Sequence, residues 1–185
     1  KKRINKSNNL AKKKVIFVSR LLYDKGIFDY MNLVNKVDKE KVEFYLAGER
    51  DDGNPQNISD KDMERILNVE NLNYLGKINV ETELSKFDIS IIMSSHEGFS
   101  RSLLESLYVG LYCLAYKIQG TEVMKGFDNL ELIEPNHIEK FVEFIENFNE
   151  IDDNSKNIQL TEQFYSSQVV ASQFEIIYKE LGVLD

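Results

Sequence analysis

The chain holds 185 residues, of which 42% are hydrophobic and 29% charged, with a formal net charge of -8 at pH 7. This length and composition are typical of one globular domain. The acidic balance argues against a nucleic-acid partner, because proteins that bind phosphate backbones present a basic surface. The sequence has no signal-peptide pattern and no apolar run near the roughly 20 residues that a membrane span needs, so we expect a cytoplasmic protein.

Basic residues crowd the first positions of the chain: Lys1, Lys2, Arg3, Lys6, Lys12, Lys13 and Lys14. We interpret residues 1–13 as a basic linker or tail and residues 14–185 as the folded domain. Contact of this tail with an anionic membrane surface is the alternative, because each basic residue there gains about 1 kcal/mol. That contact would place the protein peripherally at the inner face of the plasma membrane.

From residue 14 onward, short apolar runs alternate with longer segments of helical period. This rhythm predicts a single α/β, Rossmann-like domain in which helices cover both faces of a parallel sheet. The expected strands span 15–19, 42–47, 72–75, 89–94, 112–116 and 130–133. The single cysteine, Cys113, lies within one of these runs and is expected to be buried and inert.

Helices are expected between these strands, each with an apolar face. The residues on those faces are Ile27, Tyr30, Met31 and Val34 in the first helix, Met63, Ile66 and Leu67 in the second, and Leu103, Leu104 and Leu107 in the third. Ser59 and Asp62 predict a capping box, and Gly110 predicts a left-handed helix end. Two amphipathic helices over 138–148 and 163–181, separated by the polar stretch 152–156, are expected to close the fold.

Charged residues follow two of the expected strands, where ligands of such sheets bind. Arg20, Lys25 and Gly26 come after the first strand, and Glu97 comes after the fourth, just before a helix. An arginine fork and a lysine suit a diphosphate, and a helix N-terminus offers free N–H groups to an anion. Together these features predict a diphosphate site that needs no metal, although each one alone is also common as a surface charge or a helix cap.

A second glutamate, Glu105, lies about one and a half turns inside a leucine-rich helix. An ionised carboxylate in that position needs a partner, and the hydroxyl groups of a ligand can donate hydrogen bonds to it. Seven residues separate Glu97 from Glu105.

Four stretches carry a resemblance to a known family, in the family's order: VSRLLYDKGI, FDISIIMSSHEGFSRSLLESLYVGLYCLAY, GTEVM and FEIIYKEL. They resemble the C-terminal donor-binding domain of retaining glycosyltransferases of family 4 (group 1), which have the GT-B fold. The stretch EGFSRSLLES is similar to that family's signature of two glutamates separated by seven residues. The resemblance implies transfer of a hexosyl-type sugar from a nucleotide sugar in the biosynthesis of capsule, lipopolysaccharide or a similar cell-surface polysaccharide.

The resemblance also implies roles for individual residues. Arg20 and Lys25 would bind the donor diphosphate and stabilise the leaving nucleoside diphosphate, Glu97 would contact the transferred sugar, and Glu105 the ribose. The remaining donor-binding positions are Gly26 beside the cations, the backbone of Gly98, Phe99, Ser100, Arg101 and Ser102 at the phosphates and sugar, and Gly76, Lys77 and Ile78 against the base. No cofactor and no metal are implied.

The family's acceptor site lies on an N-terminal domain that nothing in this chain resembles. A glycan or lipid-linked acceptor would bind there, so we do not expect turnover by this chain alone. The chain also departs from the family pattern at Ser19, Ser100 and Tyr112, and in a shortened loop over 120–123. Two alternatives therefore stay open: a non-catalytic nucleotide-sugar-binding module and a nucleotide-sugar epimerase.

Three further signals have simpler interpretations. Asp60-Lys61-Asp62 matches an Asp-x-Asp metal pattern but falls at a helix start, where acidic residues interact with the helix dipole. His96 is expected to form a local hydrogen bond, with contact to the sugar or a phosphate as the alternative, and His137 is expected at the start of a helix. We therefore predict no metal site.

Overall fold

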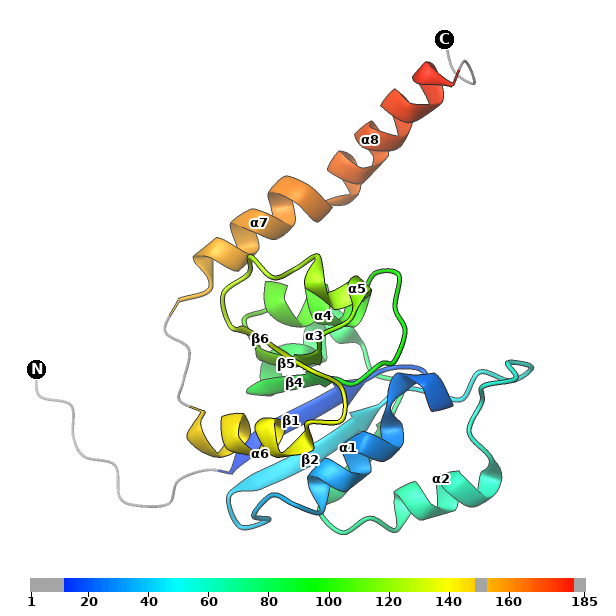
Figure 1. Cartoon of the computed structure of the whole chain (residues 1–185), viewed down its shortest axis with the longest axis vertical. Coiled ribbons are helices and arrows are strands. Elements are labelled where there is room, and N and C mark those ends of the chain that lie inside the picture. The colour runs from blue at the N-terminus through cyan, green and yellow to red at the C-terminus, as the bar shows by residue number, and fades with distance from the viewer. Residues whose placement is uncertain (1–11, 149–152, 182–185) are drawn as a thin grey trace, which may run out of the picture.

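The computed structural model describes residues 12–148 and 153–181, and within them it contains a six-stranded parallel sheet. The strands lie in the order β3-β2-β1-β4-β5-β6. Their bounds are β1 Lys13–Val18, β2 Val42–Ala47, β3 Leu72–Gly76, β4 Ile89–Ile92, β5 Tyr112–Tyr116 and β6 Leu130–Ile133. The chain thus winds outward from β1 to β3, crosses back to β4 beside β1, and winds outward again to β6 (Figure 1).

Helices cover both faces of the sheet, as the alternation of apolar runs and helical segments predicts (Figure 1). One hydrophobic core includes side chains of α1 Ile27–Val34, α2 Asp60–Leu67 and α6 Ile138–Asn147. The other includes side chains of α4 Arg101–Tyr108 and α7 Ser155–Tyr165. Shorter helices complete the connections: η1 Tyr23–Lys25, α3 Val80–Glu83, η2 Leu84–Lys86 and α5 Gln119–Glu122.

Most of the expected helix faces are buried as predicted, including all four residues named for α1. Leu67 is an error, since 56% of it is exposed at the end of α2. Ser59 caps α2 by accepting a hydrogen bond from the backbone N–H of Asp62 at 3.1 Å. The reciprocal half of a capping box is missing, because the Asp62 carboxylate accepts hydrogen bonds from the hydroxyl groups of Ser59 and Tyr23 instead.

Lys13 belongs to the folded domain and not to the expected linker. It pairs with Val42 in the sheet, and its amino group donates to the carbonyls of Ile145 and Glu146 at 2.9 and 3.0 Å. These are carbonyls near the end of α6, where a cation is favoured by the helix dipole. The rest of the predicted tail, residues 1–11, lies outside the described residues.

The second C-terminal helix, expected over 163–181, begins earlier and is divided into two helices. α7 begins at Ser155, inside the stretch 152–156 that was expected to be a polar linker. Asn157 is fully buried and exchanges hydrogen bonds with the backbone of Asp128, at 2.8 Å through its amide oxygen and 2.9 Å through its amide nitrogen. A break at Ser166 then separates α7 from α8 Ser167–Glu180, which extends away from the sheet (Figure 1). Among the described helices, none is long and apolar enough to cross a membrane.

Candidate functional site

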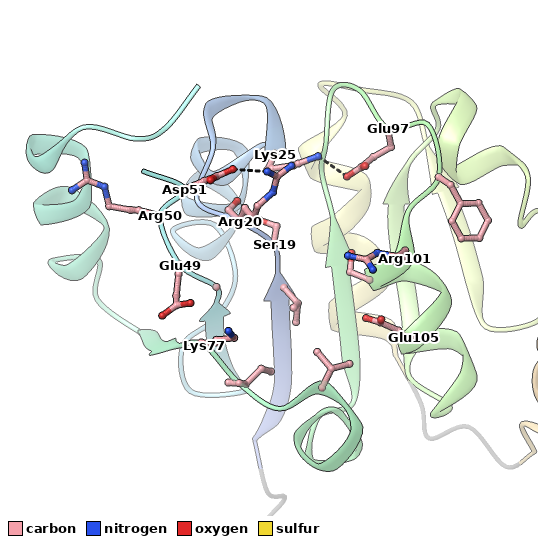
Figure 2. A pocket seen from close by; sticks show the side chains of 16 residues that line it. Ser19, Arg20, Lys25, Glu49, Arg50, Asp51, Lys77, Glu97, Arg101 and Glu105 are labelled. Carbon is pink, nitrogen blue, oxygen red and sulfur yellow. Dashed lines mark hydrogen bonds and ion pairs between the residues drawn. The ribbon is translucent and has the colours of Figure 1, made fainter. Parts of the chain in front are cut away.

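The reversal of strand order between β1 and β4 opens a crevice at the carboxyl ends of these strands, where open α/β sheets bind ligands. A pocket of about 610 Å³ lies there (Figure 2). Nine of the predicted site residues line it: Arg20, Lys25, Lys77, Ile78, Glu97, Phe99, Arg101, Ser102 and Glu105. Arg20, Lys25, Glu97 and Glu105, which are distant in the sequence, therefore converge at one edge of the sheet.

Lys25 and Glu97 form an ion pair across the crevice, with 2.9 Å between Nζ and Oε1 (Figure 2). Only 11% of the lysine side chain and 19% of the glutamate side chain are exposed. Ser94 donates a hydrogen bond to the same carboxylate oxygen at 2.9 Å. Because charges that leave water need a partner, this pair holds the loop after β1 against the loop after β4.

Two glycines let backbone segments approach each other closely beside the pocket. Gly26 has a φ of 78°, and a Cβ there would lie 2.1 Å from the carbonyl oxygen of Met93. Gly48, directly after β2, has a φ of 142°, and a Cβ there would lie 1.7 Å from the carbonyl oxygen of Ser19. The pocket therefore depends on positions that only glycine fits.

Gly26 is one of four predicted site residues that do not line the main pocket; the others are Gly76, Gly98 and Ser100. The carbonyl of Gly76 accepts a hydrogen bond from the N–H of Gly48 at 2.8 Å, so Gly76 supports the wall. Gly98 instead lines a smaller hollow of about 300 Å³ together with Glu97 and His96.

Ser100 is the N-cap residue of α4, but its side chain does not cap the helix. It is 1% exposed, and its hydroxyl has no hydrogen-bond partner among the described residues. A buried hydroxyl without a partner is unusual, because its desolvation costs free energy. The first turn of α4 is thus left without a side-chain acceptor for its N–H groups, as at an anion-binding helix N-terminus.

Glu105 lies on the side of α4 that faces the pocket (Figure 2). Leu103 and Leu107 of the same helix lie in the core. The carboxylate is exposed at the pocket, where ligand hydroxyl groups could reach it as the sequence interpretation requires. It makes no hydrogen bond or ion pair with any described residue. Partial burial raises its pKa, and the charge of Arg101 one turn away opposes that shift.

Arg20 extends into the pocket from the loop after β1, and 60% of its side chain is exposed. Its Nη1 atom lies 2.5 Å from Oδ2 of Asp51 (Figure 2). Asp51 belongs to the segment Gly48, Glu49, Arg50 and Asp51, which follows β2 and lines the pocket but is missing from the predicted site. The rule that ligands bind beyond strand ends points to this segment as well, since it comes directly after an expected strand.

The histidines and the Asp-x-Asp pattern have local partners. His96 Nδ1 lies 3.0 Å from the hydroxyl of Ser95, and His137 begins α6 with its ring against the carbonyls of Glu134 and Pro135. Asp60 and Asp62 lie in the first turn of α2, as expected. Over residues 12–148 and 153–181, no group of three His, Cys, Asp or Glu side chains is arranged to hold a metal ion.

The family described as "Glycosyl transferases group 1" matches residues 1–163. No curated protein matches the chain in sequence.

Solved structures match the fold at low identity. Anabaena HepE in complex with UDP has a TM-score of 0.75 at 17% identity, and the match covers 91% of this chain and 49% of HepE. Staphylococcus aureus TarM in complex with fondaparinux, alpha-GlcNAc-glycerol and UDP has a TM-score of 0.72 at 22% identity, covering 96% and 38%. The pneumococcal O-GlcNAc transferase GtfA in complex with UDP and GlcNAc has a TM-score of 0.69 at 17% identity, covering 94% and 37%.

These matches confirm the predicted fold, a Rossmann-like domain of the GT-B type. In each of them the chain spans less than half of the solved protein.

Proposed function

Because the chain belongs to the family of group 1 glycosyl transferases, we propose that it forms the donor-binding half of a retaining enzyme that transfers a sugar from a nucleoside diphosphate sugar. The observation that carries the proposal is the pocket between β1 and β4, where the cations Arg20 and Lys25, the carboxylates of Glu97 and Glu105, and the N-terminus of α4 meet.

The diphosphate would lie between Arg20, Lys25 and the N-terminus of α4. Arginine and lysine supply positive charge, and the uncapped N–H groups of the first helical turn supply donors at the positive end of the helix dipole. These groups can neutralise the leaving nucleoside diphosphate as the glycosidic bond breaks, so no metal is required.

The two glutamates would contact different parts of the donor. Glu105 lies on α4 with a free carboxylate, which suits the hydroxyl groups of the ribose. Glu97 lines both the main pocket and the smaller hollow beside His96, which suits the transferred sugar. Lys77 and Ile78, after β3, supply a surface for the base.

The acceptor would bind to a second domain. The chain spans only part of the solved proteins it matches, which leaves room in the whole protein for such a domain. We propose a glycan or lipid-linked acceptor, and a place in cell-surface polysaccharide synthesis such as that of capsule or lipopolysaccharide. In that setting the enzyme would act in the cytoplasm, peripherally at the inner face of the plasma membrane.

Isothermal titration calorimetry with UDP, GDP and ADP, each with and without EDTA, tests the donor site. UDP is the first ligand to try, because HepE, TarM and GtfA were each solved with it. We expect one nucleoside diphosphate to bind with the same affinity in EDTA. Binding of none of the three would overturn the proposal, and loss of binding in EDTA would overturn its metal-free form. A non-catalytic module would bind the same ligands, but adding the acceptor domain would produce no transfer.

A further inference from the structure

The loop after β2 is tied to the loop that carries Arg20 by several backbone contacts. The N–H of Leu21 donates to the carbonyl of Glu49 at 2.9 Å, and the N–H of Tyr23 donates to the carbonyl of Gln56 at 2.8 Å. Leu22 and Asn57 form an antiparallel bridge. These contacts hold the two loops in a fixed relation at the rim of the pocket.

Asp51 is held in place within this loop by two asparagines. The amide nitrogen of Asn54 donates to Oδ2 of Asp51 at 3.1 Å, and the backbone N–H of Asp51 donates to the amide oxygen of Asn57, also at 3.1 Å. The same Oδ2 atom accepts the hydrogen bond from Nη1 of Arg20 at 2.5 Å. Asp51 is thus fixed by hydrogen bonds with Asn54 and Asn57 that do not depend on its contact with Arg20.

The pairing leaves most of the guanidinium free. Arginine carries five N–H donors in a planar fork, so one Nη1 hydrogen bond to Asp51 leaves the other donors available. With 60% of its side chain exposed at the pocket, Arg20 can keep Asp51 on one side of the fork and bind an anion on another.

We propose that Asp51 is a positioning residue that presents the Arg20 guanidinium to the donor diphosphate. This inference rests on the proposed function. A free arginine loses side-chain freedom when it binds a phosphate, whereas an arginine already held by Asp51 loses less. Asp51 therefore increases affinity through Arg20, although its own charge repels the ligand.

Binding of UDP and GDP to the wild-type chain, D51A and D51N tests the proposal. D51A frees Arg20, and we expect affinity about threefold to tenfold weaker, as for immobilising one long side chain on binding. D51N keeps an oxygen that can accept from both Arg20 and Asn54, so we expect affinity equal to wild type or tighter. In an R20A background, D51A should not weaken binding further, because only the repulsion between Asp51 and the ligand is then removed.

E70A is the control, because Glu70 forms an exposed ion pair with Lys39 and neither residue lines the pocket. It should leave the affinity unchanged. In the ligand-free protein, nitrogen-15 NMR of the arginine side chains should show slower Nη rotation for Arg20 in wild type than in D51A, with the Arg20 signal identified by its loss in R20A.

The outcomes separate the two proposals. If wild type binds a nucleoside diphosphate and D51A binds it equally or more tightly, only the positioning role is overturned. The same holds if D51N is as weak as D51A, if D51A still weakens binding in the R20A background, or if Arg20 rotates equally fast in wild type and D51A. If wild type binds neither ligand, the donor site itself is overturned, and this inference with it.

Discussion

Replacing Gly26 by alanine should destabilise the protein through one specific contact. The left-handed backbone at this position costs an alanine about 1–2 kcal/mol. The new Cβ would also lie 2.1 Å from the carbonyl oxygen of Met93, closer than such atoms approach. That oxygen belongs to the backbone just beyond β4 and cannot move aside as a flexible side chain can. Forcing extra volume into a packed region adds about 1–3 kcal/mol.

Gly76→Ala is the matched control for this substitution. Gly76 has a φ of 65°, so it carries a similar backbone strain, but a Cβ there would meet nothing within 4 Å. We therefore expect Gly26→Ala to lose about 1–3 kcal/mol more of unfolding free energy than Gly76→Ala. For a domain of this size that difference corresponds to roughly 2–12 °C in Tm.

Urea unfolding followed by circular dichroism measures both free energies. Calorimetry with the nucleoside diphosphate adds a second readout, because moving Gly26 also moves Lys25 away from Glu97. Equal losses of stability for Gly26→Ala and Gly76→Ala would refute the reasoning, since the close approach to Met93 would then carry no cost.

Three further predictions follow from the site and the core. Glu105→Gln should weaken nucleoside diphosphate and intact donor alike, by about tenfold or more for a charged hydrogen bond to ribose, in calorimetry; an unchanged affinity would remove Glu105 from the ribose site. Because the pKa of Glu105 is raised in the fold, the unfolding free energy of wild type should decline relative to that of Glu105→Gln as the pH rises above 4.5. A wild-type free energy that instead grows relative to Glu105→Gln with pH would contradict this sign. Cys113 is fully buried, and burial raises the pKa of its thiol, so a thiol reagent should label it only in urea, and rapid labelling of the native protein would show an open β5 region.

Much of the fold was predictable because its strands and helices are short segments with clear periods. The central strands are apolar on both faces, and Ile27, Tyr30, Met31 and Val34 recur at helical spacing and are all buried. Polar groups caused the main error. Asn157 lies between the expected linker and the expected helix, but its amide pairs with the backbone of Asp128 and anchors the first turn of α7. Periodicity of apolar residues carries no information about such a bond.

The site was predictable where a motif or a strand end indicated it. Arg20, Lys25, Glu97 and Glu105 were identified in this way, and all four line the pocket. Asp51 was missed because its importance depends on a contact with Arg20, 31 positions away in the sequence. Composition and spacing do not reveal which of the many surface carboxylates meets which arginine.

The strand order divides the site residues between two halves of the chain. Arg20 and Lys25 come from the first three-stranded half of the chain, and Glu97 and Glu105 come from the second. Within the sheet the halves join only where β1 pairs with β4, through the registers of Val15, Ile16 and Phe17 with residues 89–91. A chain divided at the connection over residues 77–79 would therefore give two fragments, neither of which holds both the cations and the carboxylates. Recovery of nucleotide affinity on mixing them would report on reassembly of the domain, and the ligand would act as a conformational probe that recognises only the complete sheet.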